Sequence, residues 1–309
     1  MHKMTFPAMG HYTEAFEFFA SELGYKPIVP PKTTHETIKL GVRYSSDMVC
    51  FPFKSTLGNL IQGLDAGADT IFAIGVAPNN KAATCRFTYY YHVQEQILRR
   101  LGYKFKMLFI TDGRHIFSDI KKMNPSFGYL KTIKLLKNFY DKVKKIDERE
   151  YKFVKKDINI GLIGEVYTLW EPGINYDIVN KLHKMGVGVK MPLTLSWFLE
   201  QNVPFLKEKI SNYDKKEIQK YFPKKIGGHG YESISNTIRF AKNNFDGVIH
   251  LLPLSCMPET MVEMVIDFIS EDYKIPVYRF PIDENRFEAG FDTRLETFIK
   301  LLKRNKKVK

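Results

Sequence analysis

Hydrophobic residues in this chain gather in short runs that alternate with longer amphipathic stretches. The runs DTIFAIGVA (69–77), INIGLIGE (158–165) and DGVIHLLPL (246–254) are almost continuously apolar, as strands buried on both faces of a parallel sheet are. Apolar positions recur at helical spacing in residues 51–67 and 84–102. The alternation of strand and helix predicts an α/β fold built on parallel sheets.

The remaining predicted elements extend this pattern. The other predicted strands cover residues 3–7, 26–30, 104–110, 187–191 and 274–280. The other predicted helices cover residues 11–23, 34–41, 194–201, 227–243 and 258–270, with one after Pro172 and one from about Gly290. The helix over 34–41 is expected to open on a threonine–glutamate capping pattern and to end on Gly41. Residues 204–226 are rich in lysine and predict a small helical insertion.

A long lysine-rich helical pattern from Gly128 to Lys156 divides the chain. We predict an N-terminal α/β lobe over 1–127, a bridging helix over 128–157 and a C-terminal α/β lobe over 158–309. Both lobes are expected to be Rossmann-like. No apolar run is long enough to cross a membrane, and the N-terminus lacks the pattern of a secretory signal, so a cytoplasmic protein is expected.

The charge of the chain is strongly positive. It has 47 Lys and Arg against 34 Asp and Glu, a formal net charge of +13. No nucleic-acid recognition motif accompanies the charge, so a solvated lysine-rich surface is the interpretation and no nucleic-acid partner is expected. The positive field would still attract an anionic ligand or an acidic protein.

Three cysteines carry the candidate chemistry. Cys50, Cys85 and Cys256 all lie at predicted helix N-termini, and Cys256 also ends a buried strand. A helix N-terminus lowers the pKa of a thiol, and thiolate is the form that binds metal. The alternatives are packing as small hydrophobic side chains, a zinc site completed by His92 or His229, or a three-cysteine iron–sulfur cluster.

Other candidates lie near the same predicted sheet edge. Glu165 and Tyr167 follow a strand, and Glu165 is expected either to accept a proton or to cap the next helix. The amides of Gly227 and Gly228 begin a helix and are candidates for holding an anion, and His229 is a candidate proton donor.

Charged residues stand close to the cysteines in sequence. Lys54 and Arg86 follow Cys50 and Cys85, where cations would compensate a negatively charged cofactor. Glu259 is a candidate for handling a proton, although a helix cap is the favoured interpretation. Asn175 is expected to cap the helix that follows it.

Five sequence blocks, in order, give the chain a family resemblance. They are VCFPFKSTLGNL, GLIGEVYTLWEPGIN, GGHGYESI, DGVIHLLPLSCMPE and IDENRFEAGFDTRLETF. Together they resemble the 2-hydroxyacyl-CoA dehydratase superfamily, and most closely its single-chain branch of activase-associated proteins. The resemblance implies an oxygen-sensitive [4Fe-4S] cluster between Rossmann-like domains, with ligands that fall on Cys50, Cys85 and Cys256.

The resemblance also implies partners. An ATP-hydrolysing activase, itself an iron–sulfur homodimer, would supply a low-potential electron for radical dehydration or reduction of a small substrate. An acyl-CoA thioester is a candidate substrate, and a homologous second subunit is a candidate partner, because the dehydratases work as two related subunits. The chain has no P-loop or other recognisable ATP motif. The competing hypotheses are a non-catalytic electron-transfer or assembly module and a zinc-binding or metal-free α/β protein.

Overall fold

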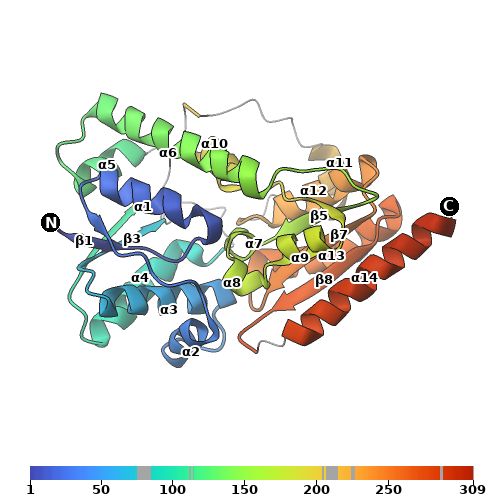
Figure 1. The fold of residues 1–309 in the computed structure, drawn as a ribbon, viewed down its shortest axis with the longest axis horizontal. Coiled ribbons are helices and arrows are strands. Elements are labelled where there is room, and N and C mark those ends of the chain that lie inside the picture. Colours follow the sequence, from blue (N-terminus) through green and yellow to red (C-terminus); the bar gives the residue numbers. More distant parts are fainter. Residues whose placement is uncertain are drawn as a thin grey trace.

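Two parallel sheets form the centre of the protein. The computed structural model describes residues 1–74, 85–110, 113, 115–203, 205–206, 215–223, 227–285 and 288–308. Every strand pairing in the described residues is parallel. Figure 1 shows the two sheets side by side with helices around them, the N-terminal lobe at the left and the C-terminal lobe at the right. The predicted α/β fold with two parallel-sheet lobes is confirmed.

The first sheet has the order β2-β1-β3-β4 and the second the order β6-β5-β7-β8. The strands of the first are β1 (Lys3–Thr5), β2 (Lys26–Pro27), β3 (Thr70–Ile74) and β4 (Lys106–Ile110). The strands of the second are β5 (Ile158–Gly164), β6 (Val187–Lys190), β7 (Gly247–Pro253) and β8 (Val277–Ile282). The lobes thus repeat one topology, in which β3 corresponds to β7 and β1 to β5.

The helices around the first sheet are η1 (Gly10–Tyr12), α1 (Thr13–Glu22), α2 (His35–Arg43), α3 (Phe51–Asp65), α4 (Phe87–Arg100), α5 (Ile116–Met123) and α6 (Tyr129–Glu150). Those of the C-terminal half are α7 (Val166–Trp170), α8 (Pro172–Asn175), α9 (Ile178–Lys184), α10 (Leu195–Asn202), α11 (Lys215–Tyr221), α12 (Gly230–Lys242), α13 (Met257–Tyr273) and α14 (Glu288–Val308). Among the described residues, no helix has both the length and the apolar character needed to cross a bilayer.

The central strands explain the apolar runs of the sequence. Every residue of β5 and of β7 is buried, because helices cover both faces of the second sheet. Gly164, at the end of β5, has φ +139°, and a Cβ atom there would lie 2.2 Å from the carbonyl oxygen of Leu251 on β7. Only glycine satisfies both conditions, and the two strands can therefore lie close together where they end.

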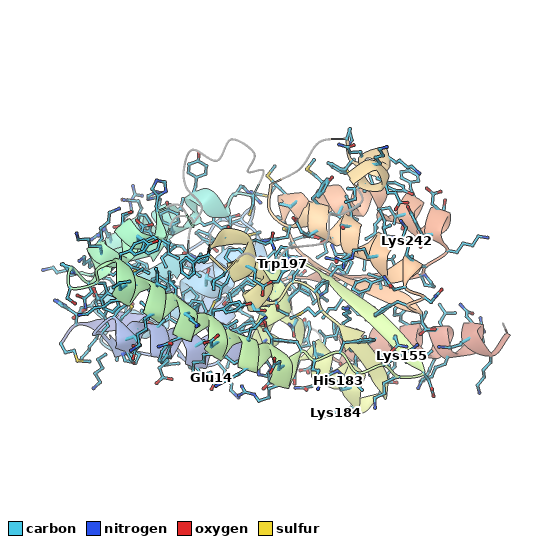
Figure 2. All side chains as sticks on the ribbon, turned by 90° about the horizontal axis from the view of Figure 1, so that it is seen from above. Glu14, Lys155, His183, Lys184, Trp197 and Lys242 are labelled. Atoms are coloured by element: carbon cyan, nitrogen blue, oxygen red, sulfur yellow. The ribbon has the colours of Figure 1, made fainter. Side chains whose placement is uncertain are left out.

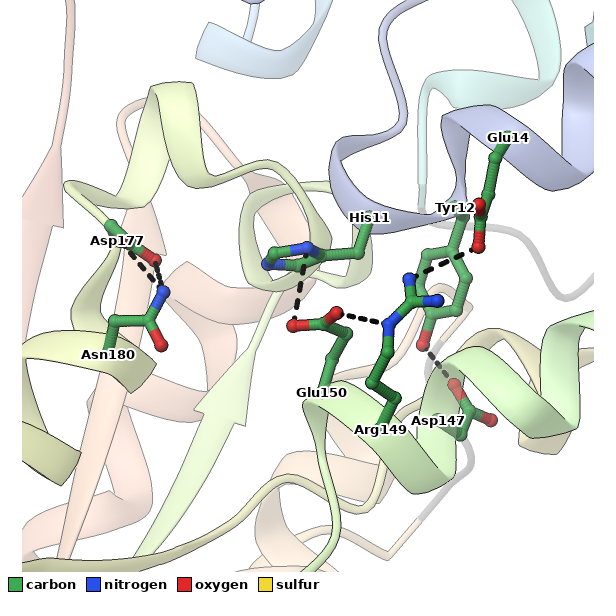
Figure 3. A network of polar contacts seen from close by, with 8 residues as sticks. All are labelled: His11, Tyr12, Glu14, Asp147, Arg149, Glu150, Asp177 and Asn180. Atoms are coloured by element: carbon green, nitrogen blue, oxygen red, sulfur yellow. Dashed lines mark hydrogen bonds and ion pairs between the residues drawn. The ribbon is translucent and has the colours of Figure 1, made fainter.

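The lobes are packed on one another through one continuous core, and a polar network holds α6 against the start of the chain. One hydrophobic cluster contains side chains of both lobes, from Met4 to Leu302. Figure 3 shows part of the polar network, where the C-terminal end of α6 meets the start of the chain. There the Tyr12 hydroxyl donates to Asp147 (2.5 Å), and Arg149 pairs with Glu14 (3.1 Å). The α10 residue Trp197 lies near the middle of the molecule in Figure 2.

Some details differ from the sequence-based expectations. Helix α5 was not recognised in the sequence, although Ile116, Ile120 and Met123 are buried on one face of it. Gly41 does not end α2 but lies within it, where a Cβ atom would stand 1.7 Å from the carbonyl oxygen of Lys54 on α3. Glycine is present for close helix packing, not for a turn. The part of the predicted strand 69–77 beyond Ile74 lies outside the described residues, and the predicted domain boundaries stay predictions.

Candidate functional site

The three cysteines lie where the two lobes meet. Cys50 is the N-cap residue of α3, Cys85 stands just before α4, and Cys256 is the N-cap residue of α13. In the repeated topology Cys85 follows β3 and Cys256 follows the equivalent strand β7. The carboxyl ends of central strands are where open α/β sheets bind their ligands, and here those of the two sheets approach the same boundary.

A backbone hydrogen bond joins the two lobes beside the cysteines. The N–H of Phe51, next to Cys50, donates to the carbonyl oxygen of Leu254, two residues before Cys256 (3.2 Å). Because both partners are main-chain groups, the contact fixes the starts of α3 and α13 relative to each other.

Arg86 strengthens this connection. Its Nη1 donates to the carbonyl oxygen of Met48 (3.0 Å), and its Nη2 donates to that of Ser255. Arg86 therefore links the segment that precedes Cys50 to the segment that precedes Cys256. A Cβ atom on Gly228 would lie 3.3 Å from Cβ of Cys85 and 2.6 Å from Cγ of Pro258. The loop before α12 therefore packs against Cys85 and the start of α13.

Cys50 and Cys256 do not have the lowered thiol pKa expected at helix N-termini. Burial raises the pKa of the Cys50 thiol to about 12, a negative charge on Glu165 or Cys85 would raise it further, and a hydrogen bond from Tyr90 opposes the effect. Burial also raises the pKa of Cys256, with the charges of Glu259, Glu165 and Cys50 as further causes. The expectation of preformed thiolates is wrong, because loss of hydration outweighs the helix dipole.

The contacts of Phe51 and Arg86 place the three cysteines in one region, where the charge of one group affects the pKa of another. Cys50 responds to charge on Cys85 and Glu165, and Cys256 responds to charge on Cys50, Glu165 and Glu259. Each of the three cysteines is present as a thiol. Among the described residues, no three His, Cys, Asp or Glu side chains stand close enough together to bind a single metal ion.

Glu165 is held firmly at this boundary. It is the N-cap residue of α7, and its carboxylate accepts hydrogen bonds from the N–H groups of Tyr167 (3.0 Å) and Thr168 (2.8 Å). Burial raises the pKa of its carboxyl group, and the helix amides oppose that shift. The prediction that Glu165 caps a helix is therefore confirmed. Its predicted role as a proton acceptor stays a prediction.

Tyr167 connects the lobes. Its hydroxyl donates to the carbonyl oxygen of Ala8 (2.8 Å) and to Oδ1 of Asn59 (3.2 Å), both in the N-terminal lobe. The nearby Asn175 is not the predicted N-cap of the following helix, because it ends α8 and the N-cap residue of α9 is Asp177. Its Oδ1 nevertheless accepts from the N–H of Ile178, the first residue of α9 (3.4 Å).

Glu259 does not cap α13. Its Oε2 lies 2.7 Å from Nε2 of His250 on β7 and accepts from the Ser233 hydroxyl of α12 (3.0 Å). His250 and Glu259 are 0% and 1% exposed, and Nδ1 of His250 and Oε1 of Glu259 have no hydrogen-bond partner in the described part of the chain. Sequence analysis missed His250, whose only signal was a histidine within an otherwise apolar strand.

The remaining candidates occupy distinct settings. The Lys54 ammonium is buried and pairs with Glu284 of the C-terminal lobe, Nζ to Oε1 2.5 Å. His229 precedes α12, and its ring centroid lies 5.9 Å from that of Trp197. His92 is exposed on α4, with its ring beside Tyr91 (4.1 Å between centroids).

Open hollows occur elsewhere on the surface. One is lined by Asp147, Glu148 and Lys152, and the other lies along α4 beside His92 and Arg100. No cysteine lines either hollow.

Comparisons with known proteins identify a family for most of the chain. Residues 7–195 match the model of the family described as "CoA enzyme activase uncharacterised domain (DUF2229)". The matched segment contains Cys50 and Cys85 and ends before Cys256. No curated protein sequence matches the chain. A crystal structure of an ABC transporter substrate-binding protein from Listeria monocytogenes EGD-e is similar at 14% identity and a TM-score of 0.27, covering 93% of this chain and 91% of that one.

Proposed function

The chain belongs to the CoA enzyme activase domain family, and from this premise we propose that it is an iron–sulfur protein that works with an ATP-dependent activase. In this proposal Cys50, Cys85 and Cys256 hold a [4Fe-4S] cluster at the boundary of the lobes. The activase, an iron–sulfur homodimer, delivers one low-potential electron to the site. The electron is used for radical dehydration or reduction of a small substrate, with a CoA thioester as the candidate.

The observation that carries the proposal is the meeting of three thiols that are far apart in sequence. Soft thiolates are the ligands that iron–sulfur clusters prefer. The helix starts that carry Cys50 and Cys256 are joined by the hydrogen bond from Phe51 to Leu254, and Arg86, next to Cys85, donates to Ser255. The unpartnered Oε1 of Glu259, whose charge acts on Cys256, is a further polar atom at this place.

The chain's own residues fit a negatively charged group. The helices α3 and α13 begin at Cys50 and Cys256, so their N-terminal partial charges face the thiols. Arg86 adds a full positive charge within the same segments. When bound, the cluster would supply one-electron chemistry, and we propose Glu165 and Glu259 as the carboxyl groups that would hold or move a proton there.

The direct test uses single-residue variants. Protein prepared and reconstituted without air should be brown, and Cys85→Ala should lose that colour together with its iron and sulfide. Val93→Ala, an exposed truncation on α4, is the matched control and should keep both. Unchanged iron content in Cys85→Ala would contradict the ligand assignment.

A non-catalytic electron-transfer module is the second candidate function. The observation that favours it is that, among the described residues, no cysteine lines the hollow beside Asp147 and Lys152 or the one beside His92 and Arg100. Addition of a CoA thioester to the reduced protein distinguishes the two functions. A changed EPR spectrum favours the enzyme, and an unchanged spectrum with retained electron transfer to a protein acceptor favours the module.

A further inference from the structure

Helix α13 has an apolar stripe on its solvent-facing side. Met257, Met261, Met264 and Phe268 recur at intervals of four, three and four residues and so share one face of the helix. Met257, Met264 and Phe268 are 45%, 75% and 59% exposed, and Met261 is half-buried. We call these four residues the α13 stripe.

The α13 stripe is a second apolar face of the helix, distinct from the face that packs against the core. The inward face of α13 is formed by Val262, Ile266 and Ile269, which are fully buried. A helix that needed only to cover the sheet would have polar residues on the opposite side. Clustered exposed apolar side chains mark interaction surfaces, and methionine suits such surfaces because its side chain is flexible and polarisable.

The apolar surface begins at the cysteines. Leu254 and Met48 are both exposed. The carbonyl oxygen of Leu254 accepts the hydrogen bond from Phe51 that joins the lobes, and that of Met48 accepts from Arg86 within the N-terminal lobe. Met257 follows Cys256 directly. A protein that covers the start of the α13 stripe at Met257 would therefore contact the residue next to Cys256.

The charge of α13 itself is opposite to that of the whole chain, although Arg279 of β8 pairs with Asp267 (3.1 Å). The helix contains Glu263, Asp267, Glu271 and Asp272 besides the buried Glu259, and it has no Lys, Arg or His. The chain as a whole has a formal net charge of +13. The complementary surface is an apolar patch bordered by lysine and arginine, since opposite charges steer partners together and penalise the wrong ones.

We infer that the α13 stripe, with Leu254 and Met48, is the docking surface for the protein that donates the electron to the thiol site. The inference rests on the proposed function, because an electron donor must dock on a surface near the thiol site. The donor loses one electron, the site gains it, and no bond is formed or broken in the transfer. The donor's docking surface is apolar with a basic border.

The test compares two electron donors on one variant. Met264→Glu places a charge in the middle of the stripe, eight residues from Cys256. In reconstituted protein we expect reduction by the reduced activase with ATP to slow by about tenfold or more, as at an interface hot spot, while reduction by dithionite keeps the wild-type rate. Leu130→Glu, at an exposed apolar position on α6, is the control and should match the wild type with both donors.

Each other outcome contradicts a different statement. Wild-type protein that binds no iron contradicts the proposed function, and the docking inference falls with it. Iron-loaded Met264→Glu that accepts electrons from the activase at the wild-type rate contradicts the docking surface alone. A wild-type dimer in sedimentation velocity that Met264→Glu dissociates would assign the stripe to a second copy of the chain and also overturn the inference.

Discussion

The N–H of Phe51 and the carbonyl oxygen of Leu254 form a hydrogen bond, 3.2 Å long, across the boundary between the lobes. Their sequence neighbours Cys50 and Cys256 cap the two helices that start there. The geometry of the thiol site therefore depends on how the lobes are held together, and residues that join the lobes should affect the site even without contacting a ligand.

Arg86 is the first such residue. Arg86→Ala removes the hydrogen bonds from its guanidinium to Met48 and Ser255, and we expect the metal-free protein to lose about 1.5–3 kcal/mol of unfolding free energy. Urea unfolding measures the change. Arg100→Ala, exposed at the end of the same helix, should change it little. Equal stability of Arg86→Ala and wild type would show that this contact does not join the lobes.

The buried His250–Glu259 pair should be essential for folding stability. His250→Ala leaves the Glu259 carboxyl group buried with Ser233 as its remaining partner, so we expect a loss of roughly 3–5 kcal/mol. His92→Ala, at an exposed histidine, is the control. Replacing both members of the pair by apolar residues should recover part of the loss, whereas a fully stable His250→Ala variant would contradict this account.

Gly41 should tolerate no side chain. Gly41→Ala puts a Cβ atom 1.7 Å from the backbone of Lys54, so α2 and α3 must separate at a cost of about 1–3 kcal/mol or more. Gly128→Ala is the matched control, because its φ is −81° and no atom lies within 4 Å of the added Cβ. Thermal unfolding compares the two, and similar melting temperatures would contradict the close packing of these helices.

Asp147 should give the stability a defined pH dependence. Burial raises the pKa of its carboxyl group above the ordinary value of 3.8, so the folded state binds its proton more tightly than the unfolded state does. This contribution to stability is complete below pH 3.8 and is lost as the pH rises through the raised pKa. Asp147→Asn lacks that loss, so its stability relative to wild type should increase over this range in urea unfolding. If the stability of Asp147→Asn relative to wild type falls over this pH range, the pKa of Asp147 is lowered by folding and the prediction is wrong.

The thiols should react slowly in the folded, metal-free protein. A pKa of about 12 in place of 9.0 lowers the thiolate fraction of Cys50 at pH 8 by about a thousandfold. Burial adds to the protection of Cys256, which is 4% exposed. Peptide mapping after iodoacetamide treatment should show both residues labelled far more slowly than in urea. Equal labelling rates in the two conditions would contradict the raised pKa values.

The apolar runs were sufficient to predict the fold class. Strands β5 and β7 are buried on both faces, so their side chains had to be apolar, and this constraint is visible in the sequence. The role of Gly41 was not visible, because a glycine that ends a helix and one that lets two helices touch look alike in one sequence. Their difference lies in the neighbouring helix α3.

The candidate site was predictable in part. The position of each cysteine at a helix start followed from local patterns, such as the prolines after Cys50 and Cys256. The raised thiol pKa values depend on burial between two lobes, which no local pattern reports. His250 was missed for the same reason, since its partners on α12 and α13 are brought to it only by the sheet.

The most direct measurement of the central claim is the amount of iron and acid-labile sulfide per chain after reconstitution without air, combined with EPR of the reduced protein. The account predicts about four of each, with the signal of a one-electron-reduced [4Fe-4S] cluster. It also predicts that serine at any one of the three cysteine positions lowers both amounts. Wild-type protein that retains neither iron nor sulfide would contradict the claim that the two lobes bring these thiols together to hold one cofactor.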